Sequence, residues 1–210
     1  MKIAVFGASG AIGTHFIKSA LKEGHDLHLY SRKKIDLADP AKTKLFIGEL
    51  SDIETIRKTI KDTDAVVSFL GPALKFSYPG MPITNGHENI IRAMKELNVS
   101  RFITIATPAV KFEKDKSSVI TIMPKIMARL FMPKPYKEIV AVGKLTKSSE
   151  LDWTIIRFVA PADGEPTGNV KVTFGDKKIG FKITRADIAG FALKELTHGE
   201  YVRSMPIIGS

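Results

Sequence analysis

The residues best suited to chemistry lie near the start of the chain, where Gly7, Gly10 and Gly13 follow one another at intervals of three. They stand between the apolar run 2–6, which predicts a β-strand, and a stretch from Ala11 whose apolar residues recur with helical spacing. Glycine permits a sharp turn and a close approach of the backbone to a ligand, and the first amides of a helix attract an anion. The pattern predicts a cradle for the diphosphate of a dinucleotide, with a tight turn that binds nothing as the alternative.

The end of the second predicted strand, 27–30, indicates which dinucleotide would bind. Folds that prefer NAD place an acidic residue here, where it takes the ribose hydroxyls. This chain has Ser31 followed by Arg32 and Lys33, with no acid before Asp36. A carboxylate would repel a 2′-phosphate, whereas the Arg32 fork can clamp one and Lys33 adds a point charge. We therefore expect NADP in preference to NAD, the alternative being an exposed basic turn.

Apolar runs of β type alternate with stretches of helical periodicity as far as residue 157. The near-continuous apolar run 64–70 is typical of a central parallel strand that is covered on both faces. Such alternation with short connections predicts a doubly wound parallel sheet of the α/β class. Further strands are predicted over 44–48, 101–106 and 151–157, and helices over 53–60, about 85–97 and 136–149, with a loop over 73–83.

The segment 111–135 is less regular, because prolines break up a run that is rich in Ile, Met and Leu. We expect a helical flap packed on its own domain, with a contact to a protein partner or a lipid surface as the alternative. The segment 158–182 predicts a substrate-side loop and a small hairpin that pairs 171–174 with 180–183. The remaining predictions are a helix over 184–196, a last strand within 201–208 and a single domain over 1–210 with a small C-terminal lobe.

The composition is that of a globular protein, with 44% hydrophobic and 26% charged residues among 210. No apolar run approaches the roughly 20 residues needed to cross a bilayer, so no membrane is expected. The absence of cysteine fits a reducing compartment, and the cytoplasm is expected. The net charge is +10, but the basic residues are dispersed and accompany no nucleic-acid-binding motif, so no nucleic acid is expected. The five histidines lack metal-ligand spacing, are expected at caps or on the surface, and predict no metal site.

Several blocks of the sequence have the form of a known superfamily. The blocks are the glycine turn 7–13, the junction 30–32, 48–52, 64–67, 151–157 and 183–189. Together they resemble the atypical short-chain dehydrogenase/reductase superfamily, and within it the small NAD(P)H-binding subgroup of NmrA-like proteins, biliverdin reductase B and NADH–flavin reductases. The resemblance implies a Rossmann-like sheet and a nicotinamide cofactor, and it leaves the substrate open.

The resemblance also implies roles for residues at the ends of the strands. Those expected around the diphosphate are Gly7, Ser9, Gly10, Ala11 and Ile12. Arg32 is expected at the 2′-phosphate, and Glu49 and Leu50 are expected beside the adenine. Those expected along the path to the nicotinamide and substrate are Phe69, Leu70, Gly71, Pro72, Ala106, Thr107, Pro108 and the stretch from Phe158 to Ala160.

The catalytic pair of that superfamily is missing here. Many members use a tyrosine and a lysine four residues later, and the tyrosine gives the proton. In this chain Tyr136 is followed four residues later by Val140, although Lys144 stands two turns along a similar helix face. After the strand 101–106 only Thr107 offers a hydroxyl. Thr107, Tyr136 and Lys144 are therefore the candidate catalytic residues, without the usual pair to support them.

Two hypotheses follow from these residues. The first is an NADPH-dependent reductase whose small-molecule substrate is a planar, conjugated acceptor such as a flavin or quinone. Such acceptors take a hydride with less help from a protein acid than a ketone needs, because the cofactor carries the hydride and the protein mainly aligns the two. The alternative is a non-catalytic, NADP(H)-binding redox sensor that acts through a protein partner at 111–135.

Overall fold

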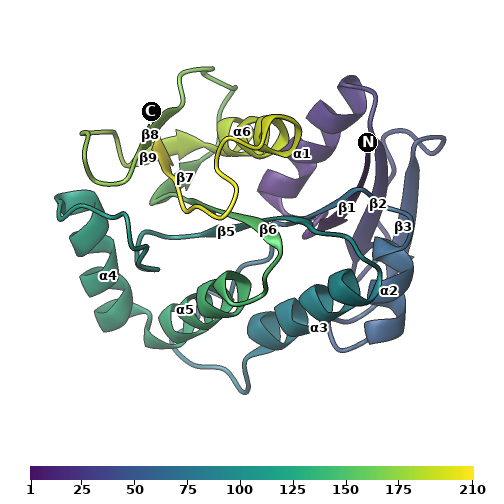
Figure 1. Cartoon of the computed structure of the whole chain (residues 1–210), viewed down its shortest axis with the longest axis horizontal. Helices are drawn as coiled ribbons and strands as arrows, with labels where there is room; N and C mark the ends of the chain where they lie inside the picture. Colours follow the sequence, from purple (N-terminus) through teal and green to yellow (C-terminus); the bar gives the residue numbers. More distant parts are fainter.

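The computed structural model describes residues 1–210, which form a large sheet flanked by helices (Figure 1). The sheet has 8 strands in the order β3-β2-β1-β4-β5-β6-β10-β8. Neighbouring strands are parallel except for β10 and β8. The strands are β1 (Lys2–Phe6), β2 (Asp26–Ser31), β3 (Thr43–Ile47), β4 (Ala65–Ser68), β5 (Arg101–Ala106), β6 (Asp152–Arg157), β8 (Lys171–Thr173) and β10 (Ile207–Gly209). A second sheet pairs β7 (Ala160–Ala162) with β9 (Lys182–Thr184).

Helices cover both faces of the large sheet (Figure 1). On one face lie α1 (Ala11–Lys22) and α6 (Arg185–His198), and on the other lie α2 (Ile53–Ile60), α3 (Pro82–Glu96), α5 (Pro133–Lys147) and, beside α5, α4 (Val119–Phe131). Strand residues alternate between two apolar clusters, so that Val5 packs towards α1 and α6 while Phe6 packs towards α2 and α3. Burial on both faces explains why these strands read as apolar runs. The predicted doubly wound parallel sheet is confirmed.

The chain order reverses between β1 and β4, which lie side by side in the middle of the sheet. From β1 the chain builds outward through β2 and β3, and it then returns to β4 and continues through β5 and β6 on the other side. In folds of this kind the crevice at the carboxyl ends of the strands, at the point of reversal, receives the ligand. The glycine turn after Phe6 and the segment after Ser68 both leave the sheet at that point.

The predicted hairpin of 171–174 with 180–183 is wrong. A turn does form between the two runs, because the Asp176 carboxylate accepts a hydrogen bond from the Phe174 amide at 3.0 Å. The strands then separate: β8 pairs antiparallel with β10, and β9 pairs parallel with β7. Their partners come from elsewhere in the chain, and pattern reasoning on adjacent residues favours the nearer pairing.

Two helix boundaries also differ from the prediction. The loop predicted over 73–83 ends early, because α3 begins at Pro82 with that proline in its first turn. Pro124 does not interrupt the flap, since it lies inside the continuous helix α4. The break expected from the prolines occurs instead at Met132 and Pro133, where α4 ends and α5 begins.

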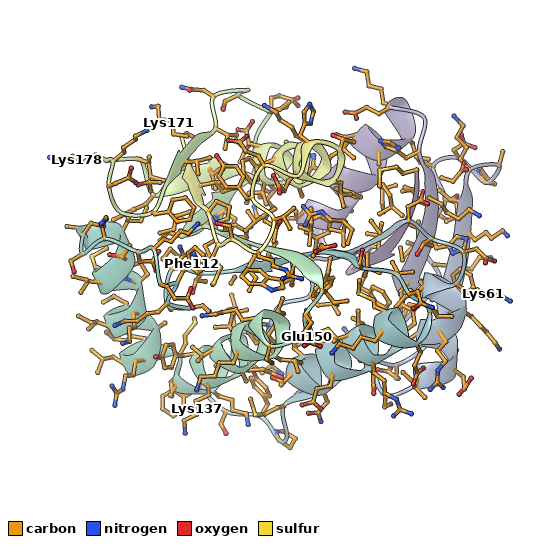
Figure 2. All side chains as sticks on the ribbon, in the orientation of Figure 1. Lys61, Phe112, Lys137, Glu150, Lys171 and Lys178 are labelled. Atoms are coloured by element: carbon orange, nitrogen blue, oxygen red, sulfur yellow. The ribbon has the colours of Figure 1, made fainter.

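Helix α4 leaves most of its apolar side chains in solvent. Only Ile120 and Thr121 are buried, and a Ser118–Thr121 capping box fixes its first turn. Figure 2 shows Phe112 directed inward and Lys137 directed outward from α5. The exposed apolar residues of this flap are Val119, Ile122, Met123, Ile126, Met127, Leu130, Phe131 and Met132. None of the helices is both long enough and apolar enough to span a bilayer.

Candidate active site

The glycine turn after β1 is shaped by close packing of backbone on backbone. Gly7 has φ of +80°, and a Cβ there would stand 3.0 Å from the Phe69 carbonyl carbon. A Cβ on Gly13 would stand only 2.3 Å from the Gly7 carbonyl oxygen. Both positions therefore require glycine, the first for its left-handed conformation and the second for the contact of α1 with the turn. This packing places the start of α1 directly beside the end of β1.

The first turn of α1 presents amides that no protein group uses. Gly10 occupies the cap position without a side-chain cap, and the first turn contains no acidic residue. The amides of Ala11 and Ile12 have no hydrogen-bond partner, and the cap residue and Ala11 are exposed. Unpaired amides at a helix N-terminus, with its positive dipole end, suit a diphosphate. Ser9 is exposed beside them, so its hydroxyl is also available.

Arg32 and Lys33 follow β2 at the same edge of the sheet. Phe6 and Tyr30 are neighbours in the register of β1 and β2, which brings the residues after each strand together. Arg32 and Lys33 are both exposed and make no ion pair, while the Lys33 amide donates to the Ser31 hydroxyl at 3.3 Å. The turn therefore offers two unpaired cations next to the glycine cradle, as a 2′-phosphate would require.

The residues predicted beside the adenine are held by side chains from two other elements. The Tyr30 hydroxyl donates to the Glu49 carbonyl at 2.6 Å, and burial raises the pKa of Tyr30 to about 12, so it stays a neutral donor. The Asn89 amide donates to the Leu50 carbonyl at 2.8 Å. A Cβ on Gly86 would approach Leu50 Cδ1 to 2.8 Å, so Leu50 lies flat against α3. The exposed Glu49 side chain has no partner.

The end of β4 rests on a buried polar network that the sequence did not reveal. The Nε2 atom of His87 lies 3.1 Å from the Ser68 hydroxyl and 3.3 Å from the Thr104 hydroxyl. Its Nδ1 lies 2.8 Å from the Ile83 carbonyl. Burial lowers the pKa of His87 to about 4, so the ring is neutral and joins α3 to both strands. His87 is fully buried, which corrects the expectation that all histidines lie at caps or on the surface.

Phe69, Leu70, Gly71 and Pro72 leave the sheet at the point of chain reversal. The Phe69 amide donates to the Phe6 carbonyl at 2.9 Å, which continues the β1–β4 pairing one residue past the strand. Phe69 is buried against Phe16, whereas Gly71 is exposed and Leu70 is half-buried. The predicted path to the nicotinamide thus begins at a buried aromatic side chain and ends at an exposed glycine.

Glu138 on α5 is the second residue that sequence reasoning missed. Its side chain is fully buried, and Oε1 accepts from the amides of Ile83 at 2.6 Å and Thr84 at 3.1 Å. Its other oxygen accepts from the Tyr78 hydroxyl at 2.5 Å, and burial raises the pKa of Tyr78. This carboxylate caps α3 from another helix and explains why α3 begins at Pro82. It also brings the first turns of α3 and α5 to the same edge of the sheet.

The residues after β5 and β6 lie side by side. Ala106 is buried, and its carbonyl accepts from the Phe158 amide at 3.3 Å. Thr107 is half-buried and starts a turn in which its carbonyl accepts from the Val110 amide at 3.0 Å. Its hydroxyl accepts from the Ala109 amide at 3.3 Å and remains free to donate.

Tyr136 and Lys144 line one hollow of about 500 Å³ beside that turn, although no hydrogen bond joins them. Thr107 is not among the lining residues, so the structure brings together two of the three catalytic candidates and leaves the third on the adjoining turn. We call this space the lysine hollow. Its principal side chains are those of Val110, Lys111, Lys125, Tyr136, Lys144 and Lys147.

Arg157 has a structural role in the wall of the hollow. It is fully buried, and its guanidinium donates to both Asp115 oxygens, at 2.7 and 2.6 Å. It also donates to the Val110 carbonyl at 2.9 Å and to the Met205 carbonyl. The guanidinium group of this one residue thereby links the start of the flap to β6. The residue after it is the buried Phe158.

Among relatives with curated names, the isoflavone reductase homologue A622 of Nicotiana tabacum is 32% identical over 114 residues, which are 49% of this chain and 34% of that protein. The chain thus matches about a third of the length of this plant relative. The uncharacterized protein YwnB of Bacillus subtilis is 26% identical over 96% of this chain and 94% of its own length.

Solved structures share the fold over the whole chain. ChuY, described as an anaerobillin reductase of Escherichia coli O157:H7, has a TM-score of 0.79 at 18% identity and covers 100% of this chain and 97% of its own. A short-chain dehydrogenase/reductase of Veillonella parvula, crystallised with NADP, has a TM-score of 0.78 at 14% identity and covers 100% of this chain and 94% of its own.

The family comparison covers nearly the whole chain. The model of a family described as NAD(P)H-binding matches residues 7–199, from the first glycine of the cradle to the end of α6. The matched range includes each strand-end residue discussed above. This chain therefore belongs to the NAD(P)H-binding family.

Proposed function

We propose that this protein is an NADPH-preferring oxidoreductase that reduces a planar, conjugated acceptor such as a flavin or quinone. The observation that carries the proposal is the open cradle at the start of α1, with unpaired amides and no acidic residue, beside the unpaired Arg32. We place the reaction in the cytoplasm, which the absence of cysteine fits.

The residues present fit a dinucleotide. The missing side chains of Gly7 and Gly13 let the turn pack against the start of α1, and the amides of Ala11 and Ile12 there suit the diphosphate. Arg32 would hold the 2′-phosphate with two parallel N–H groups, and Lys33 would add charge. The chemistry that the cofactor supplies when bound is transfer of a hydride.

The protein's own contribution at the nicotinamide end is mainly alignment. We expect the strand ends that carry Phe69, Leu70 and Phe158 to form an apolar floor for the ring, with Ala106 and Thr107 beside it. An apolar floor suits a flat ring and excludes water from the transfer. The reduced acceptor also needs a proton, for which the Thr107 and Tyr136 hydroxyls are the candidates, with Lys144 beside the latter.

The relatives support reduction of a conjugated molecule without identifying it. Proteins with this fold or with partial sequence likeness carry the names isoflavone reductase homologue and anaerobillin reductase. Both names describe action on extended conjugated systems. A conjugated acceptor also fits the absence of the tyrosine and lysine pair, because ring nitrogens and oxygens of such acceptors exchange protons readily with water.

The test is a panel of acceptors with purified protein. We expect NADPH absorbance to fall faster than in protein-free controls with a flavin or a naphthoquinone, and more slowly when NADH replaces NADPH. The Gly13→Ala variant, in which the cradle amides are displaced, should react more slowly than the parent at NADPH concentrations below the parent's KM. No oxidation above background across flavins and quinones, in protein that binds NADPH, would contradict the proposal.

A second candidate is an NADP(H)-binding sensor that acts through a protein partner at the flap 111–135. The exposed apolar side chains of α4 favour it, because single surface apolar residues are common but a contiguous set marks an interaction surface. Its test is capture of a partner whose binding differs between NADP⁺ and NADPH and is weakened by Met127→Asp. Equal capture in both redox states would exclude sensing.

A further inference from the structure

The lysine hollow carries more positive charge than its surroundings neutralise. Lys111, Lys125 and Lys144 make no ion pair, whereas Lys147 pairs with Glu113 at 2.5 Å. No aspartate or glutamate lines the hollow. Lysine side chains brought together without carboxylates repel one another, and the arrangement becomes favourable when an anion enters.

The acids on the elements that line the hollow are already paired or buried, and Glu113 is the partner of Lys147. Asp115 is held by both nitrogens of the buried Arg157, and Glu138 is buried on the start of α3. Between these two residues the stretch 116–137 contains five basic residues and no acid. Of these five residues Lys125 lines the hollow, and no carboxylate from this stretch compensates its charge there.

The walls of the hollow are fixed before any ligand arrives. Arg157 holds the Val110 carbonyl at 2.9 Å. A Cβ on Gly143 would stand 2.5 Å from Val110 Cγ1, so the turn after β5 packs closely on α5. Fixed walls lower the cost of ordering a bound group, and only the lysine side chains need to settle on it.

Part of the hollow lies near the edge of the sheet where the hydride would be transferred. The 3.0 Å hydrogen bond from the Val110 amide closes a turn on the Thr107 carbonyl, which puts their Cα atoms within about 7 Å. Tyr136 stands two residues before Glu138, whose contacts with the first turn of α3 place it at the same edge. The phosphates of a dinucleotide have their own cradle beyond β4 and β1, so the hollow is left for the other reactant.

We propose that the lysine hollow binds an anionic phosphate or carboxylate group of the acceptor while the acceptor's ring lies on the apolar floor near Thr107. This inference rests on the proposed reductase function and specifies its substrate class: planar acceptors that carry an acidic group, in preference to neutral ones. Lys111 and Lys125 contact the anion from the turn and from α4, Lys144 contacts it from α5, and the Tyr136 hydroxyl donates to it, which leaves Thr107 as the candidate proton donor to the ring.

Two flavins with the same ring system provide the test, because riboflavin 5′-phosphate (FMN) differs from riboflavin by one phosphate. We expect the KM for FMN to be about tenfold below that for riboflavin. The variant Lys111→Gln/Lys125→Gln should raise the KM for FMN about tenfold and change the KM for riboflavin and for NADPH by less than about twofold.

The matched control is Lys137→Gln/Lys178→Gln, which removes the same charge from two exposed lysines outside the hollow that Figure 2 shows pointing outward. It should leave both flavins unaffected. Salt gives a second readout: raising the ionic strength from about 0.01 M to about 1 M shortens the Debye length from about 30 Å to about 3 Å. The KM for FMN should rise accordingly, and that for riboflavin should stay constant.

Equal KM values for the two flavins, or an effect of the lysine variant on NADPH instead of FMN, would overturn the inference. If neither flavin is reduced, the proposed function fails for flavins, and direct binding still decides the inference. Quenching of flavin fluorescence in the presence of NADP⁺ should then show binding of FMN that is tighter than binding of riboflavin and is weakened in Lys111→Gln/Lys125→Gln. Equal affinities would overturn the proposal.

Discussion

The substitution Gly13→Ala tests whether this position requires glycine for close packing or tolerates any small residue. The added Cβ would lie 2.3 Å from the Gly7 carbonyl oxygen, whereas side-chain carbons essentially never come closer than 3.0 Å. Neither atom belongs to a flexible side chain, so α1 and the turn must separate by at least about 0.7 Å to relieve the contact between them. The amides of Ala11 and Ile12 move with the helix.

Two effects on stability oppose each other in this variant. Alanine gains up to about 1 kcal/mol over glycine within a helix, and forced overpacking costs about 1–3 kcal/mol. We expect the clash to dominate, with a net loss of about 1–2 kcal/mol in the free energy of unfolding. Misplacement of binding groups by about 1 Å can cost about a hundredfold, so the affinity for NADPH should fall by about that factor.

Gly190→Ala makes the same chemical change at a helical glycine of α6 where a Cβ would meet nothing within 4 Å. It should raise the free energy of unfolding by about 0.5–1 kcal/mol and leave NADPH affinity unchanged. Urea unfolding and calorimetric titration with NADPH measure both quantities. If Gly13→Ala unfolds at the parent's midpoint and binds NADPH with the parent's Kd, the account of the cradle is refuted.

Four further outcomes are expected. Arg32→Asp should weaken NADPH by the loss of a charge-assisted contact of about 1.5–3 kcal/mol and leave NADH nearly unchanged; equal losses in titrations with the two would show that the preference is misassigned. Burial lowers the pKa of His87 to about 4, so between about pH 6.5 and pH 4 the unfolded chain binds a proton at this residue and the folded chain does not. The free energy of unfolding should therefore fall by up to about 3 kcal/mol as the pH is lowered through this range. His87→Gln should remove that part of the pH dependence in denaturant melts, and an unchanged slope would argue against it. Glu138→Gln should cost about 1–3 kcal/mol in urea unfolding, since the cap of α3 loses its charge; a loss below about 0.5 kcal/mol would contradict this role. Arg157→Met should lower the free energy of unfolding by about 3–5 kcal/mol, because it leaves the Asp115 carboxylate without its partner. Adding Asp115→Asn to this variant should recover part of that loss, and no recovery would mean that the two residues are not coupled.

The parts of the fold that local chemistry decides could be predicted from the sequence. The conformations of the glycine turn and of the central strands depend on adjacent residues. The turn needs the positive φ that Gly7 adopts, and β4 forms from a short apolar run. The observed β4, Ala65–Ser68, lies within the predicted run 64–70, and the predicted strand 101–106 coincides with β5. Periodicity and glycine placement suffice where each residue's neighbours along the chain set its conformation.

The features that could not be predicted depend on partners far along the chain. The cap of α3 is the Glu138 carboxylate, about fifty residues away, and nothing near Pro82 signals it. The same holds for β8 and β9, which share a turn but pair with β10 and β7. Helical spacing predicts that Lys144 and Tyr136 share a face of α5, and both line one hollow in the structure. Lys111 from the turn and Lys125 from α4 reach the same hollow only through tertiary packing, which the sequence does not signal.

The position of β10 between β6 and β8 has a consequence for how the molecule assembles. The strands from β1 to β5 find all their neighbours among residues 2–157, so this half of the sheet can form without the C-terminal residues. β8 has no neighbour in the sheet until β10 has paired with β6, where Ile207 lies beside Arg157. β8 is joined to the sheet only through the three-residue strand β10, so its attachment requires two pairings in addition to those made within residues 2–157. The rim contributed by β8 should therefore gain protection from hydrogen exchange last during refolding, and lose it first when the molecule opens.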